Sequence, residues 1–152
     1  MRTIFVKRED FPAEWLVVDA AGMTLGRLSS RIAYVLMGKG KPGFSRQMDI
    51  GDHVVVVNAE KVRLTGNKSE TKTYFRFSGY PGGAKFTSFK ELIEKDPAEV
   101  LMHAVRGMLP HNRLGRKMVK KLHVYRGPSH PHSAQNPRAW IPGKVTQVNG
   151  GL

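Results

Sequence analysis

Five basic residues in the C-terminal third of the chain have types and a spacing that suit phosphate binding. Helical intervals place them on one face: Arg113, Arg116, Lys117, Lys120 and Lys121. The opposite face is apolar and can pack on a core: Leu114, Met118 and Leu122. Residues 104–127 contain no carboxylate, so local ion pairs are not available to neutralise the basic face. We therefore expect its counter-charge to be an external polyanion.

A proline corner must position this basic helix. Asp96 and Pro97 have the side chains of an N-cap and a first-turn residue, which predicts a preceding helix. Pro110 cannot continue that helix, so residues 107–110 form a corner, and Asn112 can cap the next helix. We expect Arg106, His111 and Asn112 to contact nucleic acid beside the corner, although His111 could equally cap a carbonyl group.

The rest of the chain alternates strands and helices. Residues 15–18 and 53–58 are typical of buried strands, and between them Thr24 and Gly38 bound an amphipathic helix. This order is a βαβ unit with parallel strands. A half-exposed strand is expected at residues 61–65 and a last strand at residues 123–125.

These elements predict a three-layer α/β/α domain around a small, mainly parallel sheet. We place this nucleic-acid-binding domain at residues 1–127 and expect residues 128–152, rich in proline and glycine, to form a basic tail that is either extended over a surface or disordered. Within the tail, Trp140 and Ile141 could bury against RNA or a neighbouring protein.

Two further basic segments are candidates for the interface. Residues 38–46 combine glycine with charge, and their candidates are Lys39, Lys41 and Arg46. An exposed flexible loop is the equal alternative for this segment. Three cations and one aromatic residue lie near the Gly-rich residues 79–83: Lys68, Lys72, Arg76 and Tyr80. The cations could bind a phosphate backbone, and the Tyr80 ring could stack on an unpaired base. We expect the neighbouring Phe75 and Phe77 to pack internally.

Composition narrows the classes of function. The 152 residues suit one domain, and 25 Lys+Arg against 12 Asp+Glu give a net charge of +13, which favours nucleic acid over an anionic membrane surface. No carboxylate follows Glu99. The chain has no cysteine, which excludes disulfides and thiolate zinc sites. It has neither an apolar run of about 18 residues nor a signal-peptide pattern, so we expect a cytoplasmic protein.

Motifs for catalysis or cofactors are weak in this sequence. Neither a P-loop nor a G-x-G-x-x-G pattern is met, and His130 with His132 has no third metal ligand of known proximity. A triad could be imagined from Ser29 or Ser30 with His103 and Asp49, but no nucleophile-elbow sequence supports it. We expect no cofactor, no metal and no catalytic site.

Several long motifs resemble the thirteenth family of large-subunit ribosomal proteins, in its bacterial branch. The motif at residues 105–127, VRGMLPHNRLGRKMVKKLHVYRG, is accompanied in order by residues 15–27, 58–68, 78–83 and 127–137. The chain departs from the family pattern by continuing through residues 138–152.

This resemblance implies a structural component of the large ribosomal subunit rather than an enzyme. It implies binding to large-subunit rRNA, early action in subunit assembly, neighbouring ribosomal proteins as partners, and the same three-layer fold. It implies neither a membrane partner nor a small-molecule substrate. The alternatives are a nucleic-acid-modifying or nucleotide-dependent α/β enzyme, and a regulatory RNA-binding protein that works off the ribosome.

Overall fold

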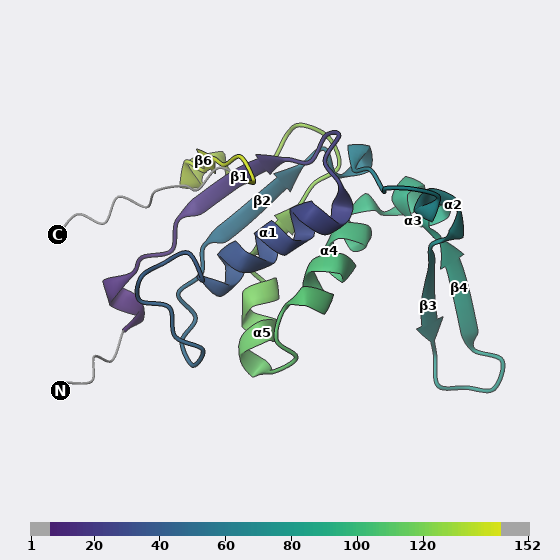
Figure 1. The fold of residues 1–152 in the computed structure, drawn as a ribbon, viewed down its shortest axis with the longest axis horizontal. Helices are drawn as coiled ribbons and strands as arrows, with labels where there is room; N and C mark the ends of the chain where they lie inside the picture. Colours follow the sequence, from purple (N-terminus) through teal and green to yellow (C-terminus); the bar gives the residue numbers. More distant parts are fainter. Residues whose placement is uncertain (1–6, 144–152) are drawn as a thin grey trace.

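A four-stranded parallel sheet forms the centre of the computed structural model, which describes residues 7–143 (Figure 1). The strands are β1 (Trp15–Asp19), β2 (His53–Val57), β5 (Leu122–Val124) and β6 (Arg138–Ala139), in the order β5-β2-β1-β6. In the register of β1 and β2, Trp15 pairs with His53 and Val17 with Val55. Side chains therefore alternate between two faces of the sheet.

The first face carries the main hydrophobic core. Strand side chains of this face pack with the helices α1 (Leu25–Met37), α4 (Pro97–Met108) and α5 (Arg113–Val119). The strand contribution is Leu16, Val18, Val54, Val56 and Leu122. The expected βαβ unit is confirmed, because α1 connects two neighbouring parallel strands.

Local signals account for most helix ends. Gly38 ends α1 at a φ of 74°, a left-handed conformation that glycine adopts without a side-chain clash. The Asp96 carboxylate accepts hydrogen bonds from the backbone N–H groups of Ala98 (3.0 Å) and Glu99 (3.2 Å) at the start of α4. Ser88 caps α3 (Phe89–Lys95) by accepting from the N–H of Glu91. The caps at Gly38 and Asp96 were expected from the residue types, whereas the Thr24 side chain makes no capping hydrogen bond at the start of α1.

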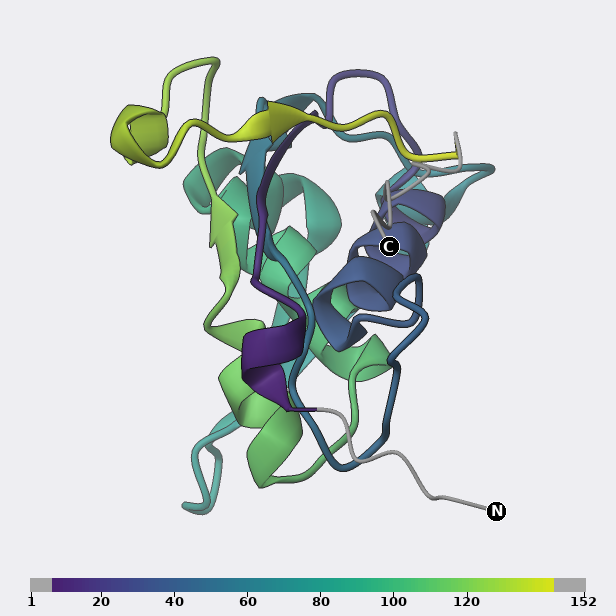
Figure 2. The same cartoon turned by 90° about the vertical axis from the view of Figure 1, so that its left-hand side faces the viewer.

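The second face carries stacked aromatic rings and a short 3₁₀ helix, η3 (His132–Gln135). Trp15 stacks on His53 with ring centroids 4.4 Å apart, and His123 lies 4.5 Å from His132. The Tyr125 hydroxyl shares a 2.7 Å hydrogen bond with His132. Figure 2 shows η3 and α1 on opposite sides of the sheet. The α/β fold with helices around a parallel sheet is thus confirmed. One outer layer consists of α1, α4 and α5, whereas the other, within residues 7–143, contains only the short helix η3.

Stability should depend on pH through His123. Burial, followed by the neighbouring charge of His132, lowers the pKa of His123 below its ordinary value of 6.5. Between that lowered pKa and 6.5 the unfolded chain binds more protons, so the free energy of unfolding should fall as the pH drops through this window. We expect thermal unfolding midpoints to show this fall and the variant His123→Phe, which keeps a ring but cannot titrate, to show a smaller one. An identical pH dependence in both proteins would contradict the assignment.

Three parts of the fold differ from expectation. The prediction of a strand at residues 61–65 is wrong. Lys61 belongs to the 3₁₀ helix η2 (Ala59–Lys61), and the segment that follows forms only an isolated bridge between Arg63 and Thr24. A small antiparallel hairpin forms from β3 (Thr73–Phe77) and β4 (Ala84–Ser88), and β4 was not predicted. Strand β6 pairs with β1, and the Trp140 side chain beside it is buried in the core. Residues 128–143 thus contribute to the domain, while residues 144–152 lie outside the described part.

Two short elements complete the chain: η1 (Arg8–Asp10) and α2 (Lys68–Thr71), which leads into the hairpin. Among residues 7–143, no helix is both long and apolar enough to cross a membrane.

Candidate nucleic-acid interface

The proline corner fixes the position of α5. Helix α4 ends at Met108, Leu109 is buried, and the Asn112 side chain accepts a 2.8 Å hydrogen bond from the backbone N–H of Gly115. Gly115 is buried so close to the Pro110 carbonyl oxygen that any Cβ would collide with it. The corner therefore requires both the capping amide, which was predicted from Asn112, and a residue without a side chain at position 115, which was not predicted.

Helix α5 presents one apolar side and one cationic side. Met118 is buried in the core, while Leu114 is half-buried. The exposed cations are Arg113, Arg116, Lys117 and Lys120. Within residues 7–143, none of these four is in an ion pair. An unpaired row of positive charge on a fixed helix can bind a phosphate backbone.

Lys121 does not belong to this exposed row, contrary to the sequence-based expectation. Helix α5 ends at Val119, and the chain then turns into β5, so Lys121 lies only 6% exposed beneath the helix. Its ammonium group forms an ion pair with Asp49 and donates to the carbonyl oxygens of Gly51 (3.0 Å) and Leu36 (3.3 Å). The residue therefore joins three segments of the domain.

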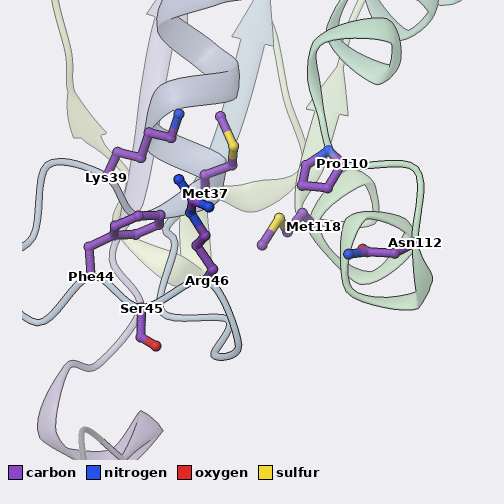
Figure 3. Close-up of a pocket in the computed structure, with 8 residues that line it drawn as sticks. All are labelled: Met37, Lys39, Phe44, Ser45, Arg46, Pro110, Asn112 and Met118. Carbon is purple, nitrogen blue, oxygen red and sulfur yellow. The ribbon is translucent and has the colours of Figure 1, made fainter.

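The loop of residues 38–46 lies against the corner. Lys39 and Arg46 are exposed there and line one side of a groove of about 350 Å³. Figure 3 shows these loop residues facing Pro110, Asn112 and Met118 across the groove. The structure thus brings together two basic segments that are more than 60 positions apart in the sequence.

Lys41, the third candidate of this loop, is also buried rather than exposed. Its ammonium group donates to the Asp52 carboxylate at 2.6 Å and to the Pro12 carbonyl oxygen at 3.1 Å. With only 6% of its surface exposed, it fastens the loop to the domain instead of offering charge to a ligand. The expectation that Lys41 is a surface cation is wrong, because a carboxylate distant in sequence neutralises it.

A second groove of about 250 Å³ adjoins the other side of the corner. Arg106, His111 and Arg116 line it together with Pro110 and Asn112. All three of these basic side chains are exposed. The sequence-predicted residues at the end of α4 and the start of α5 therefore share one surface, centred on the corner.

The remaining candidates lie around the β3–β4 hairpin. Lys68, Arg76 and Tyr80 are exposed, and the Lys72 ammonium group lies 5.3 Å from the Tyr74 ring centroid. Figure 1 shows the hairpin projecting from the domain on the same side as α5 but separate from it. The structure therefore gathers the candidates into two areas, one at the corner and one at the hairpin.

Sequence reasoning was wrong about the hairpin phenylalanines and missed one cation. Phe75 and Phe77 are 60% and 58% exposed, respectively, instead of packed internally. Lys85 is exposed directly opposite Arg76 in the strand register. The alternation of polar and apolar residues at 84–88 was the signal that could have revealed this strand.

The acidic and imidazole members of the imagined triad make other contacts. Asp49 pairs with Lys121, and the His103 ring packs edge-on against Tyr74 at 5.4 Å. In the described part of the chain, no group of three or more His, Asp or Glu side chains could hold a metal ion.

Comparison with known proteins gives a consistent result over nearly the whole chain. A model of the family Ribosomal protein L13 matches residues 13–131. A Lawsonia intracellularis protein named large ribosomal subunit protein uL13 is 57% identical over 137 residues, which cover 90% of this chain and 95% of that protein. Proteins of the same name from Desulfitobacterium hafniense (strain Y51) and Roseiflexus sp. (strain RS-1) are 53% and 54% identical, covering 92% and 93% of this chain and 98% and 97% of their own lengths.

Proposed function

Since this chain belongs to the ribosomal protein L13 family, we propose that it binds large-subunit rRNA as a structural, non-enzymatic component of the large ribosomal subunit and acts early in subunit assembly. Its further partners are neighbouring proteins of the same subunit. The sequence to residue 127 forms most of the RNA-binding platform, and residues 128–143 complete it by adding strand β6 to the edge of the parallel sheet.

One observation supports the RNA-binding role above all others. Within residues 7–143, the exposed cations of the corner are in no ion pair, and no carboxylate occurs in the sequence after Glu99. A row of positive charge without local compensation repels itself, and a phosphate backbone removes that repulsion. The binding residues at the corner are Lys39, Arg46, Arg106, His111, Asn112, Arg113, Arg116, Lys117 and Lys120. Those at the hairpin are Lys68, Lys72, Arg76 and Tyr80.

Co-sedimentation tests this function directly. The tagged protein should migrate with the large subunit when a cell lysate is resolved on a sucrose gradient, at moderate and at high salt. In the subunit many contacts act together, which should resist salt better than a single isolated site. Free protein at the top of the gradient at moderate salt would contradict the proposal. A screen for turnover of RNA and nucleotides would then examine the enzyme alternative.

A further inference from the structure

The β3–β4 hairpin has two chemically different faces. Cross-strand register pairs Phe75 with Phe86 and Phe77 with Ala84 on one face. Tyr74 pairs with Thr87 and Arg76 with Lys85 on the other. Because Tyr74 packs against His103 of α4, the phenylalanine face is turned away from that helix.

The phenylalanine face is a platform of exposed rings. Phe75, Phe77 and Phe86 are 60%, 58% and 70% exposed, and the rings of Phe75 and Phe86 lie 5.1 Å apart. Phe77 has only the methyl group of Ala84 across from it, so its ring lacks a cross-strand partner. An exposed set of large apolar side chains marks an interaction surface.

The charges of the hairpin indicate which occupant suits this face. Arg76 and Lys85 lie directly opposite each other, and two like charges in that position repel. Residues 71–89 contain no carboxylate that could relieve the repulsion. A polyanion would relieve it, and an acidic backbone that also carries flat apolar rings is a single-stranded nucleic acid.

We propose that the face formed by Phe75, Phe77 and Phe86 stacks unpaired bases of RNA, while Arg76 and Lys85, on the opposite face of this narrow two-stranded ribbon, attract the phosphates of the same strand where it passes the hairpin edge. This inference rests on the proposed rRNA-binding function and adds a specific ligand class: unpaired nucleotides, held through their ring faces. Phe77 is the position where we expect a base to stack most readily, since the small Ala84 side chain opposite it leaves space for a base. Stacking of this kind tolerates any base, because every base has a π face.

Two RNA probes separate base stacking from phosphate binding. One is a labelled oligouridylate of about 12 nucleotides, a length within the range of single-strand sites. The other is a ribose-phosphate oligomer of the same length and charge that lacks the bases. The purified full-length protein should bind the base-bearing probe roughly 5- to 150-fold more tightly for each stacked base.

Three variants assign the preference to residues. Replacing all three phenylalanines by leucine keeps apolar side chains but removes their π faces, so it should reduce the preference for the base-bearing probe to the part that the exposed Tyr80 ring can supply. The variant R76Q/K85Q should lower the affinity for both probes by a similar factor and leave the preference for the base-bearing probe unchanged. Met108→Leu is the matched control, because Met108 is also a large exposed apolar residue, 42% exposed, but lies at the end of α4 outside the hairpin. It should change neither affinity.

The possible failures can be distinguished. Equal affinity of the wild-type protein for both probes, or a preference that the triple leucine variant leaves unchanged, would overturn stacking while leaving the rRNA-binding function intact. If the wild-type affinities were equal and the triple leucine variant were incorporated normally into the subunit, the face would be assigned to an apolar protein partner instead. Absence of binding to both probes and to the large subunit would overturn the function and this inference together.

Discussion

Replacing Lys121 by methionine should lower the free energy of unfolding by about 3–5 kcal/mol, whereas the same change at the adjacent Lys120 should leave it nearly unchanged. Methionine fills a similar volume but removes the charge that faces Asp49. The carboxylate would then remain mostly buried without its partner, and the carbonyl oxygens of Leu36 and Gly51 would lose a donor. Chemical denaturation followed by circular dichroism measures the change.

The adjacent Lys120 provides a matched control for Lys121→Met. Lys120 is exposed and in no ion pair among residues 7–143, so Lys120→Met alters the same side-chain type one position away. Adding Asp49→Asn to Lys121→Met should recover part of the lost stability, because it removes the uncompensated charge. A loss below about 1 kcal/mol for Lys121→Met, the value typical of exposed pairs, would show that the buried pair matters little.

The sequence sufficed where structure is determined by neighbouring residues. Asn112 and Asp96 cap their helices as their types require, and α4 ends at Met108, two residues before Pro110 and inside the corner predicted at residues 107–110. These features depend on side chains and backbone groups only two or three positions apart. The cationic side of α5 followed from the same local periodicity.

The sequence failed where the outcome depends on segments far apart. Periodicity continued the basic helix through Lys121, but pairing of β5 with β2 ends it at Val119 and brings Lys121 to Asp49, 72 positions away. Lys41 was misassigned for the same reason, because its partner Asp52 belongs to the next segment. Phe75 and Phe77 have the composition of core residues, and only the packing of the other face of the hairpin on α4 leaves them exposed.

The site as a whole was therefore predicted better than its individual members. All of the expected segments reach the surface, and the corner joins the loop at residues 38–46 to α5 in one area. In two of the three basic segments, however, one lysine is buried and neutralises a carboxylate of another segment: Lys41 pairs with Asp52, and Lys121 pairs with Asp49. Counting charges along the chain cannot tell these structural lysines from the binding ones, which is why stability and RNA affinity must be measured separately.

Reversing two charges on the exposed side of α5 should weaken RNA binding without lowering stability. This is the opposite of the effect expected at Lys121. The variant Arg116→Glu/Lys120→Glu should bind large-subunit rRNA at least about 100-fold more weakly, since each charge-assisted contact contributes roughly 1.5–3 kcal/mol. Its unfolding should stay close to that of the wild-type protein, because neither side chain is in an ion pair within residues 7–143. Filter binding and thermal melting measure the two effects on the same preparations.

Salt dependence identifies the cause of the weaker binding. With roughly 6–10 phosphate contacts, wild-type affinity should fall by about 10³–10⁵ between 50 and 200 mM salt, and losing two contacts should flatten the logarithmic slope by about 1.4–1.8. Arg27→Glu/Arg31→Glu is the matched control, because these arginines are exposed on α1 with the same four-residue spacing and the same change in charge. If this control weakened binding as much, net charge alone would explain the affinity. A difference between the two variants, with both proteins folded, would instead assign RNA binding to the cationic side of α5, where the proline corner holds it.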